Sequence, residues 1–169
     1  VLELPGRVEP VRVAEVRARV TGIVQQRLYE EGTDVGQGQP LFRIDPAELR
    51  ASYAQTQASL ERAKATAANA NAVVQRYRPL VEENAISGQE FDAAQAAARE
   101  ANANVAQIQA QLKSASLQLG YTTVRAPIAG RAGRAAVTEG ALVSQPEGTL
   151  MTRICLLYTS PSPRDRYGS

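Results

Sequence analysis

Few side chains in this chain of 169 residues could carry out chemistry, and they do not form a pattern typical of an active site. Histidine is absent, and the single cysteine, Cys155, has neither a disulfide partner nor a second soft ligand with which to hold zinc. The aspartates have simpler uses, because Asp34 suits a turn, Asp45 precedes a helix and Asp92 complements the dipole of a first helical turn. No nucleophile with its base, and no pair of carboxylates, can be assigned a catalytic role. The sequence therefore predicts a protein without enzymatic activity, cofactor or metal ion.

Lysine could instead carry a covalently attached cofactor, but its positions argue against this. Lipoyl and biotinyl carrier domains present a modifiable lysine at a hairpin turn, whereas Lys64 and Lys113 both lie in segments that we predict to be helical. The other 19 − 2 = 17 basic residues are arginines, and they are interspersed with 17 acidic residues to leave a net charge of +2. No basic stripe favours nucleic acid as a partner. Among the functions we considered, a lipoyl or biotinyl carrier domain is therefore the most distant alternative.

Two stretches of the chain, residues 20–35 and 128–143, repeat each other. They must belong to the part of the fold that positions the side chains discussed above. In both, two glycines lie ten residues apart, a glutamate precedes the second glycine, and a valine follows three residues beyond it. The glycines are Gly22 and Gly32 in the first stretch and Gly130 and Gly140 in the second. Because glycine is favoured where φ must be positive, we expect all four to form structural turns.

The two repeats lie in segments 13–45 and 121–154, which are rich in β-branched residues and punctuated by glycine, as short strands with tight turns are. Neither segment is long enough to bury a core alone. We therefore expect the two halves to pair into one small β-domain.

The residues between the halves have the pattern of a long helical hairpin, with helices predicted at about 46–82 and 88–119. Asp45 and Pro46 indicate a helix start, because Asp caps and Pro suits the first helical position. Core residues then alternate at spacings of four and three, which favours a coiled coil. Many are alanine and bury little area, so the hairpin should be slender and modestly stable. In the first helix they are Leu49, Tyr53, Thr56, Leu60, Ala63, Ala67, Ala70, Val74, Tyr77 and Val81. In the second they are Phe91, Ala94, Ala98, Ala101, Val105, Ile108, Leu112, Ala115 and Leu119.

The turn between the helices is predicted near Asn84 and Ala85. The string from Ser87 to Glu90 fits a capping box, in which the Ser hydroxyl and the Glu carboxylate each satisfy a backbone N–H. Pro79 should loosen the last turns of the first helix. A short turn makes the helices antiparallel, so we expect the turn to form the far tip of an insertion that projects from the β-domain.

The same segments resemble the periplasmic adaptor, or membrane fusion, proteins of resistance-nodulation-division multidrug efflux pumps, and the resemblance covers about residues 1–154. It implies an α+β fold: a split lipoyl-like (barrel-sandwich hybrid) β-domain with an inserted long antiparallel α-helical coiled-coil hairpin. The matching pieces include Glu3–Arg7, Ala14–Gly22, Leu41–Pro46, Tyr121–Arg131 and Val137–Val143.

The resemblance also implies a function as a bridge between an inner-membrane proton-driven transporter and an outer-membrane channel. Such adaptors are periplasmic, associate with the inner membrane and assemble into a ring, a hexamer by resemblance. Adaptors of type I secretion, metal export and macrolide transport share the split β-domain and the hairpin. These systems remain the alternative assignment.

In this family the hairpin tip carries an Arg-x₃-Leu-x₆-Ser pattern that docks on the channel, and the resemblance carries it over to Arg76, Leu80 and Ser87. Arg76 and Leu80 are four residues apart and share a helical face, and a guanidinium suits carbonyls and carboxylates of a partner. Simpler interpretations stay open for each. Ser87 could serve only as an N-cap, Leu80 could belong to the seam, and Arg76 could be a solvated charge near Glu82 or Glu83.

The two ends of the chain differ from the rest. Residues 1–12 could supply a remnant strand of an adjoining β-barrel domain, and nothing after residue 154 supplies more of it, so we expect an internal fragment without its membrane anchor. Residues 155–169 resemble translated sequencing-adapter sequence, and we expect a non-native or disordered tail. No run of apolar residues reaches the length of a membrane span.

Overall fold

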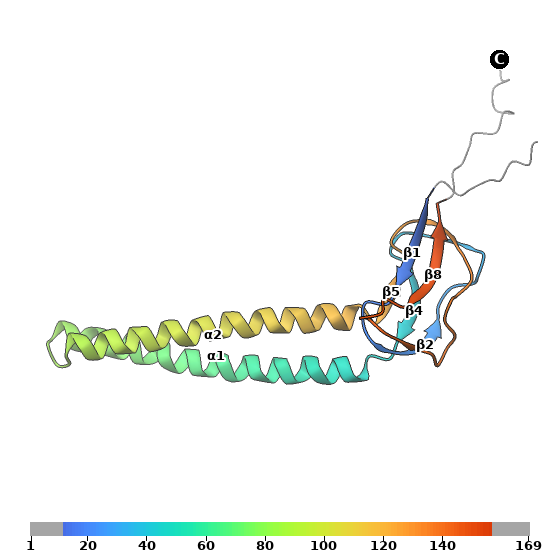
Figure 1. Cartoon of the computed structure of the whole chain (residues 1–169). Coiled ribbons are helices and arrows are strands. Elements are labelled where there is room, and N and C mark those ends of the chain that lie inside the picture. The colour runs from blue at the N-terminus through green and yellow to red at the C-terminus, as the bar shows by residue number, and fades with distance from the viewer. Residues whose placement is uncertain (1–11, 157–169) are drawn as a thin grey trace, which may run out of the picture. The chain divides into compact units, whose positions relative to one another are not determined.

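The computed structural model describes residues 12–156, and the predictions for residues 1–11 and 157–169 lie outside this range. The chain divides into two compact units, which we describe one at a time (Figure 1). The first is a β-domain built from the segments on either side of residues 46–120. The second is the helical hairpin, from Pro46 to Gly120.

The β-domain consists of two four-stranded sheets whose paired strands are antiparallel. The first sheet has the order β1-β8-β6-β3 and the second the order β5-β4-β2-β7. The strands before the hairpin are β1 (Val13–Arg17), β2 (Gly22–Arg27), β3 (Asp34–Val35) and β4 (Pro40–Ile44). Those after it are β5 (Thr123–Arg125), β6 (Gly130–Ala132), β7 (Leu142–Val143) and β8 (Leu150–Cys155).

In the structure, strands of the half that carries the first repeat pair with strands of the half that carries the second. In the β2–β7 pair, Gly22 of the first half lies opposite Val143 of the second. In the β3–β6 pair, Val35 of the first half lies opposite Gly130 of the second. Each half therefore contributes strands to both sheets, and the predicted pairing of the halves into one β-domain is confirmed.

The core of the β-domain forms where the buried faces of both sheets meet. Phe42, Leu41 and Ile44 of β4 are fully buried, as are Met151 and Ile154 of β8. Their side chains come from both halves of the chain, so neither half has a complete core alone. Burial on both faces at β4 follows from its central place in the sheet order.

The repeated glycines serve two different purposes, and the prediction that all four form turns is wrong for two of them. Gly32 and Gly140 have φ of 80° and 86°, the left-handed conformation that glycine adopts most readily. Gly22 and Gly130 instead begin strands β2 and β6 and do not have positive φ. A Cβ atom at Gly22 would lie 2.7 Å from Cγ2 of Ile44, and one at Gly130 would collide with the backbone of Cys155. These two positions need glycine because another segment passes too close for a side chain.

The hairpin consists of α1 (Ala47–Glu82) and α2 (Gly88–Gly120), which pack along each other. Every core position predicted from the alternating spacing is buried or half-buried, so the predicted seam is confirmed. The most buried positions are Leu60, Ala63, Ala67 and Val74 of α1 and Ala98 and Ala101 of α2. The helix start differs slightly from the prediction, because Pro46 occupies the N-cap position and the first helical residue is Ala47.

The second half of the β-domain also extends beyond its predicted end. Cys155, which the sequence assigned to a non-native or disordered tail, is the last residue of β8 and pairs with Val13 and Arg131. The N–H of Leu156 donates to the carbonyl of Arg12 at 3.0 Å. Backbone pairing of this kind does not depend on side-chain type, which explains why residue composition alone placed the boundary too early.

Candidate functional site

The hairpin turn is a closed, hydrogen-bonded structure rather than a loose loop. Asn84 has a φ of 57°, and its N–H donates to the carbonyl of Val81 at 3.2 Å. The N–H of Ala85 donates to the carbonyl of Leu80 at 2.8 Å. These two bonds around a left-handed residue form a Schellman motif, which ends α1 and satisfies its last carbonyls. The turn predicted near Asn84 and Ala85 is confirmed, and the helix continues past Pro79 to reach it.

Ser87 begins the second helix. Its hydroxyl oxygen accepts a hydrogen bond from the N–H of Glu90 at 3.1 Å, which is the serine half of the predicted capping box. The carbonyl of Ser87 also accepts from the N–H of Phe91 at 3.3 Å. The simple interpretation of Ser87 as an N-cap therefore holds, and its side chain remains exposed beside the turn.

Arg76 and Leu80 lie one turn apart near the end of α1, and both are exposed. The neighbouring seam positions, Tyr77 and Val81, are half-buried, whereas 36% of Leu80 is exposed to solvent. Leu80 is therefore more exposed than its neighbours in the seam. Among residues 12–156, no ion pair joins Arg76 to Glu82 or Glu83. The tip thus presents a guanidinium and an apolar side chain that the hairpin itself does not use.

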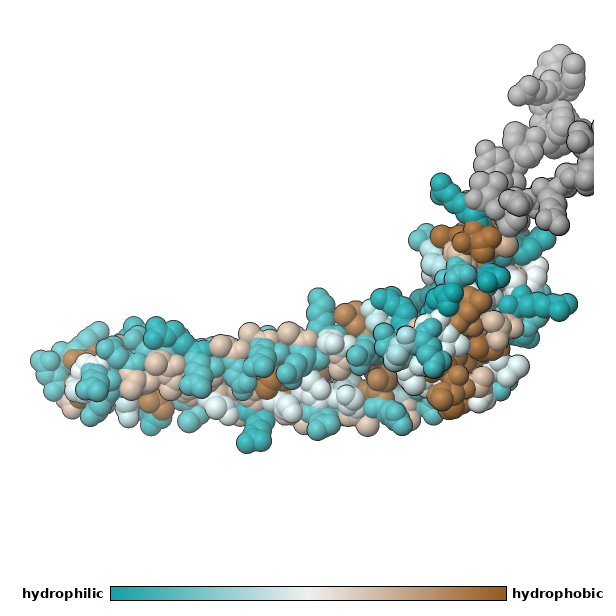
Figure 2. All heavy atoms as spheres, viewed as in Figure 1, coloured by the Kyte–Doolittle hydropathy of each residue, from teal (hydrophilic) through white to brown (hydrophobic). Residues whose placement is uncertain are grey.

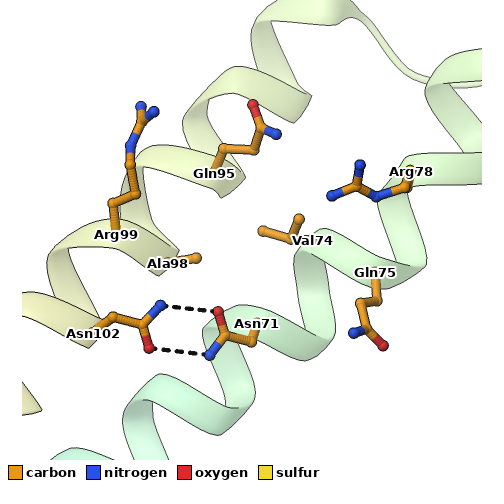
Figure 3. A pocket seen from close by; sticks show the side chains of 8 residues that line it. All are labelled: Asn71, Val74, Gln75, Arg78, Gln95, Ala98, Arg99 and Asn102. Carbon is orange, nitrogen blue, oxygen red and sulfur yellow. Dashed lines mark hydrogen bonds between the residues drawn. The ribbon is translucent and has the colours of Figure 1, made fainter.

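A groove of about 490 Å³ lies on the flank of the hairpin opposite Arg76 and Leu80 (Figure 3). Our sequence analysis did not predict this groove. Val74 and Ala98 form its floor, and Arg78 and Arg99 stand at its sides. Its other lining residues are Asn71, Gln75, Gln95 and Asn102. The spacing of these polar residues could have indicated the groove, because most of them directly follow a seam position on α1 or α2.

The amide side chains of Asn71 and Asn102 bridge the helices at one end of this groove (Figure 3). Each donates its NH₂ group to the oxygen of the other at 3.2 Å. A paired asparagine beside an apolar seam fixes the register of two helices, because a shifted register would leave both amides without this partner.

The β-domain has fewer features that indicate a functional site. A groove of about 460 Å³ runs over Val24 and Phe42, and Arg27 forms an ion pair with Glu31 at its edge. Ile23 and Leu142 are neighbours across the β2–β7 pair and are 43% and 65% exposed. On the face that Figure 2 shows, strongly hydrophobic residues gather on the β-domain and are scattered over the hairpin.

Within residues 12–156, no three His, Cys, Asp or Glu side chains gather in a way that could hold a metal ion. Neither helix of this range has an apolar stretch long enough to cross a bilayer. Lys64 lies in α1, where its ammonium is 3.8 Å from a carboxylate oxygen of Glu61, and Lys113 lies in α2. Both lysines therefore lie within helices and not at a turn between strands.

A β-domain interrupted by an inserted coiled-coil hairpin defines the structural class of this protein. The family model "RND MFP, alpha-helical hairpin domain" matches residues 52–122. The multidrug export protein AcrE of Escherichia coli strain K12 is 47% identical over 152 residues, which are 90% of this chain and 40% of AcrE. The antibiotic efflux pump periplasmic linker protein ArpA of Pseudomonas putida is 45% identical over 90% of this chain and 37% of ArpA. The chain belongs to the membrane fusion protein family of these resistance-nodulation-division systems.

A solved structure supports the same fold. A MacA–MexA chimeric protein that contains the Pseudomonas aeruginosa MexA α-hairpin domain matches with a TM-score of 0.54 and 29% identity, over 88% of this chain and 49% of the chimera. The predicted fold class, a split lipoyl-like β-domain with an inserted helical hairpin, is thereby confirmed. The chain spans about 40% of the length of AcrE and 37% of ArpA.

Proposed function

We propose that this chain is the hairpin and β-domain part of a periplasmic adaptor that connects an inner-membrane proton-driven transporter with an outer-membrane channel in a multidrug efflux pump. The adaptor performs no chemical step, and the transporter supplies the energy. The protein works in the periplasm in association with the inner membrane, and copies of it assemble into a ring. The names of AcrE and ArpA, a multidrug export protein and a periplasmic linker of an antibiotic efflux pump, support this assignment.

The observation that carries the proposal is the exposure of Arg76 and Leu80 beside the well-ordered turn at the hairpin tip. Backbone hydrogen bonds and the Ser87 cap organise the turn, so the side chains of Arg76 and Leu80 are not needed to hold it together. Arg76 and Leu80 nevertheless stand exposed on one face, with the Ser87 hydroxyl beyond the turn. A guanidinium offers five donors to carbonyls or carboxylates of a channel, and Leu80 can fill a small apolar depression. We assign channel docking to Arg76, Leu80 and Ser87.

A charge reversal at the tip tests this assignment. In a full-length adaptor completed around this chain, Arg76→Asp should abolish recruitment of the channel in a pull-down, and it should fail to restore drug resistance to an adaptor-deletion strain. Arg62→Asp is the matched control, because Arg62 is an exposed arginine two heptads earlier on the same flank of α1. Both variants should keep their helical circular dichroism.

Channel recruitment that survives Arg76→Asp would remove the docking role of the tip. A completed protein that never restores resistance to any of the drugs tested, although it folds and reaches the periplasm, would contradict the efflux function itself.

A further inference from the structure

The far end of the hairpin carries negative charge that no neighbouring cation balances. From residue 79 to residue 98 the sequence contains four acidic residues and no lysine or arginine. The acidic residues are Glu82, Glu83, Glu90 and Asp92. Within residues 12–156, none of the four forms an ion pair. A partner that docks on this tip therefore meets a local excess of carboxylates.

Three of these carboxylates have a use within the hairpin itself. Glu90 and Asp92 lie at the beginning of α2, where the helix dipole favours negative charge. Glu82 lies near the end of α1, but it follows Arg78 by four residues, the spacing at which opposite charges on a helix attract each other. The hairpin therefore accounts for these three residues without a partner.

Glu83 has neither advantage. It occupies the C-cap position of α1, at the negative end of the helix dipole, and the last turn of this helix contains no basic residue. The residues four and three positions before it, Pro79 and Leu80, carry no charge. The carboxylate of Glu83 is exposed. It is therefore unfavourable for its own helix and accessible to a partner.

Glu83 also lies on the docking face that Arg76 and Leu80 define. Its N–H donates to the carbonyl of Pro79 at 3.1 Å, so helical geometry continues to this residue. Seven residues of an α-helix fall about 20° short of two full turns, which places Arg76 and Glu83 on the same face with Leu80 between them. The levels of the two charged residues differ by about 10 Å along the helix.

We infer that Glu83 is a further docking residue and that it binds a cationic side chain, a lysine or an arginine, of the outer-membrane channel. The inference rests on the proposed function and adds the chemistry of the channel surface. A carbonyl or carboxylate of the channel faces Arg76, an apolar depression receives Leu80, and a cation lies about 10 Å further toward the turn. Opposite charges at the two ends of one face fix the direction of docking, because a reversed partner would bring like charges together.

Charge reversal at two adjacent glutamates tests this inference. The probe is the purified channel that the unmodified, completed adaptor recruits. Glu83→Lys should weaken the affinity for this channel by about fivefold or more, because a favourable exposed pair becomes a repulsive one. Glu82→Lys is the matched control, since Glu82 is equally exposed but is rotated by about 100° to the side of Arg78. It should leave the affinity unchanged, and both variants should keep their helical circular dichroism.

Glu83→Gln separates docking from helix stability. It should not lower the melting temperature, because it removes a charge that is unfavourable for the helix. It should nevertheless weaken recruitment and make recruitment less sensitive to sodium chloride, because salt screens exposed charge pairs. Equal effects of Glu83→Lys and Glu82→Lys on the affinity would overturn the inference. If Arg76→Asp still abolished recruitment in that case, the proposed function would stand and only the role of Glu83 would fall, whereas an unmodified adaptor that recruits no channel would contradict both.

Discussion

Gly130 lies so close to the backbone of Cys155 that a single added methyl group would collide with the carbonyl of that residue. The contact joins β6 to β8 inside the first sheet. A peptide group cannot rotate away as a side chain can, so the collision must be relieved by separating the strands. This relationship explains why one of the repeated glycines is needed at a position that is not a turn.

Replacing Gly130 with alanine should therefore lower the free energy of unfolding by about 1–3 kcal/mol, the range for inserting atoms into a packed interior. Gly36→Ala is the control, because a Cβ atom at Gly36 meets nothing within 4 Å. That change should leave stability unaltered or raise it by up to about 1 kcal/mol. Urea unfolding monitored by β-sheet circular dichroism measures both. Equal effects of the two substitutions would contradict the close approach.

Ser87 allows capping and docking to be separated. Ser87→Ala should cost about 1 kcal/mol of stability, because the N–H of Glu90 loses its acceptor. Ser87→Asn keeps a good N-cap and should keep the melting temperature, yet it should weaken recruitment of the channel if the hydroxyl itself docks. Thermal unfolding and the channel pull-down measure the two roles. Full recruitment by the Asn variant would leave Ser87 with the capping role alone.

The bridge between Asn71 and Asn102 should show direct energetic coupling. In a double-mutant cycle, replacement of both residues with alanine should cost less than the sum of the single changes, with a coupling energy of about 0.5–1 kcal/mol. Chemical unfolding of the four proteins gives this value. Asn69 and Asn104 are exposed asparagines of the same helices outside the groove, and the same cycle there should give no coupling.

Tyr29 should make the stability of the β-domain sensitive to alkaline pH. Its hydroxyl oxygen lies 3.0 Å from both the carbonyl oxygen of Gly133 and the hydroxyl oxygen of Thr152. Burial of the side chain is the main cause that raises the pKa of Tyr29 above its ordinary value of 10.0. A raised pKa in the folded state means that the native structure favours the protonated phenol. The contribution is therefore complete below pH 10 and is lost as the pH rises through the unfolded-state and then the folded-state pKa.

Tyr29→Phe should reduce stability at pH 7 by about 1–2 kcal/mol, because it removes the hydrogen bonds of a buried hydroxyl, and it should flatten the loss of stability above about pH 10. Unfolding curves across this range test both effects. Tyr53→Phe, a half-buried tyrosine of the hairpin, provides the comparison. An unchanged alkaline profile in the Tyr29 variant would assign that loss to another group.

The hairpin could be predicted from the sequence more completely than the β-domain, and the reason lies in the range of the interactions. Its seam depends on residues three and four apart, and its turn on Asn84 and Ser87, which act on their immediate neighbours. Local spacing and capping rules are sufficient for both. Even so, the groove was missed, because it arises where Val74 of one helix faces Ala98 of the other, and that pairing depends on the register between them.

In the β-domain the decisive contacts join distant residues. The glycine requirement at Gly22 comes from Ile44, and that at Gly130 comes from Cys155. Nothing near either glycine in the sequence distinguishes a close approach from a turn. The same is true of Tyr29, whose partners Gly133 and Thr152 lie beyond the hairpin in the chain. For the proposed docking residues, the family resemblance supplied the pattern, and the structure shows that Leu80 is more exposed than its neighbours in the seam.

The exchange of strands between the two halves constrains the order in which the parts of the molecule can fold. Strands β1 to β4 come first in the chain, but they cannot complete either sheet without strands β5 to β8. The hairpin lies between these two groups of strands, and its helices form the seam by packing on each other. Its closure brings the ends of the insertion together and so lowers the entropic cost of joining β4 to β5. The two halves of the β-domain therefore meet across a short effective loop, although 75 residues separate them in the sequence.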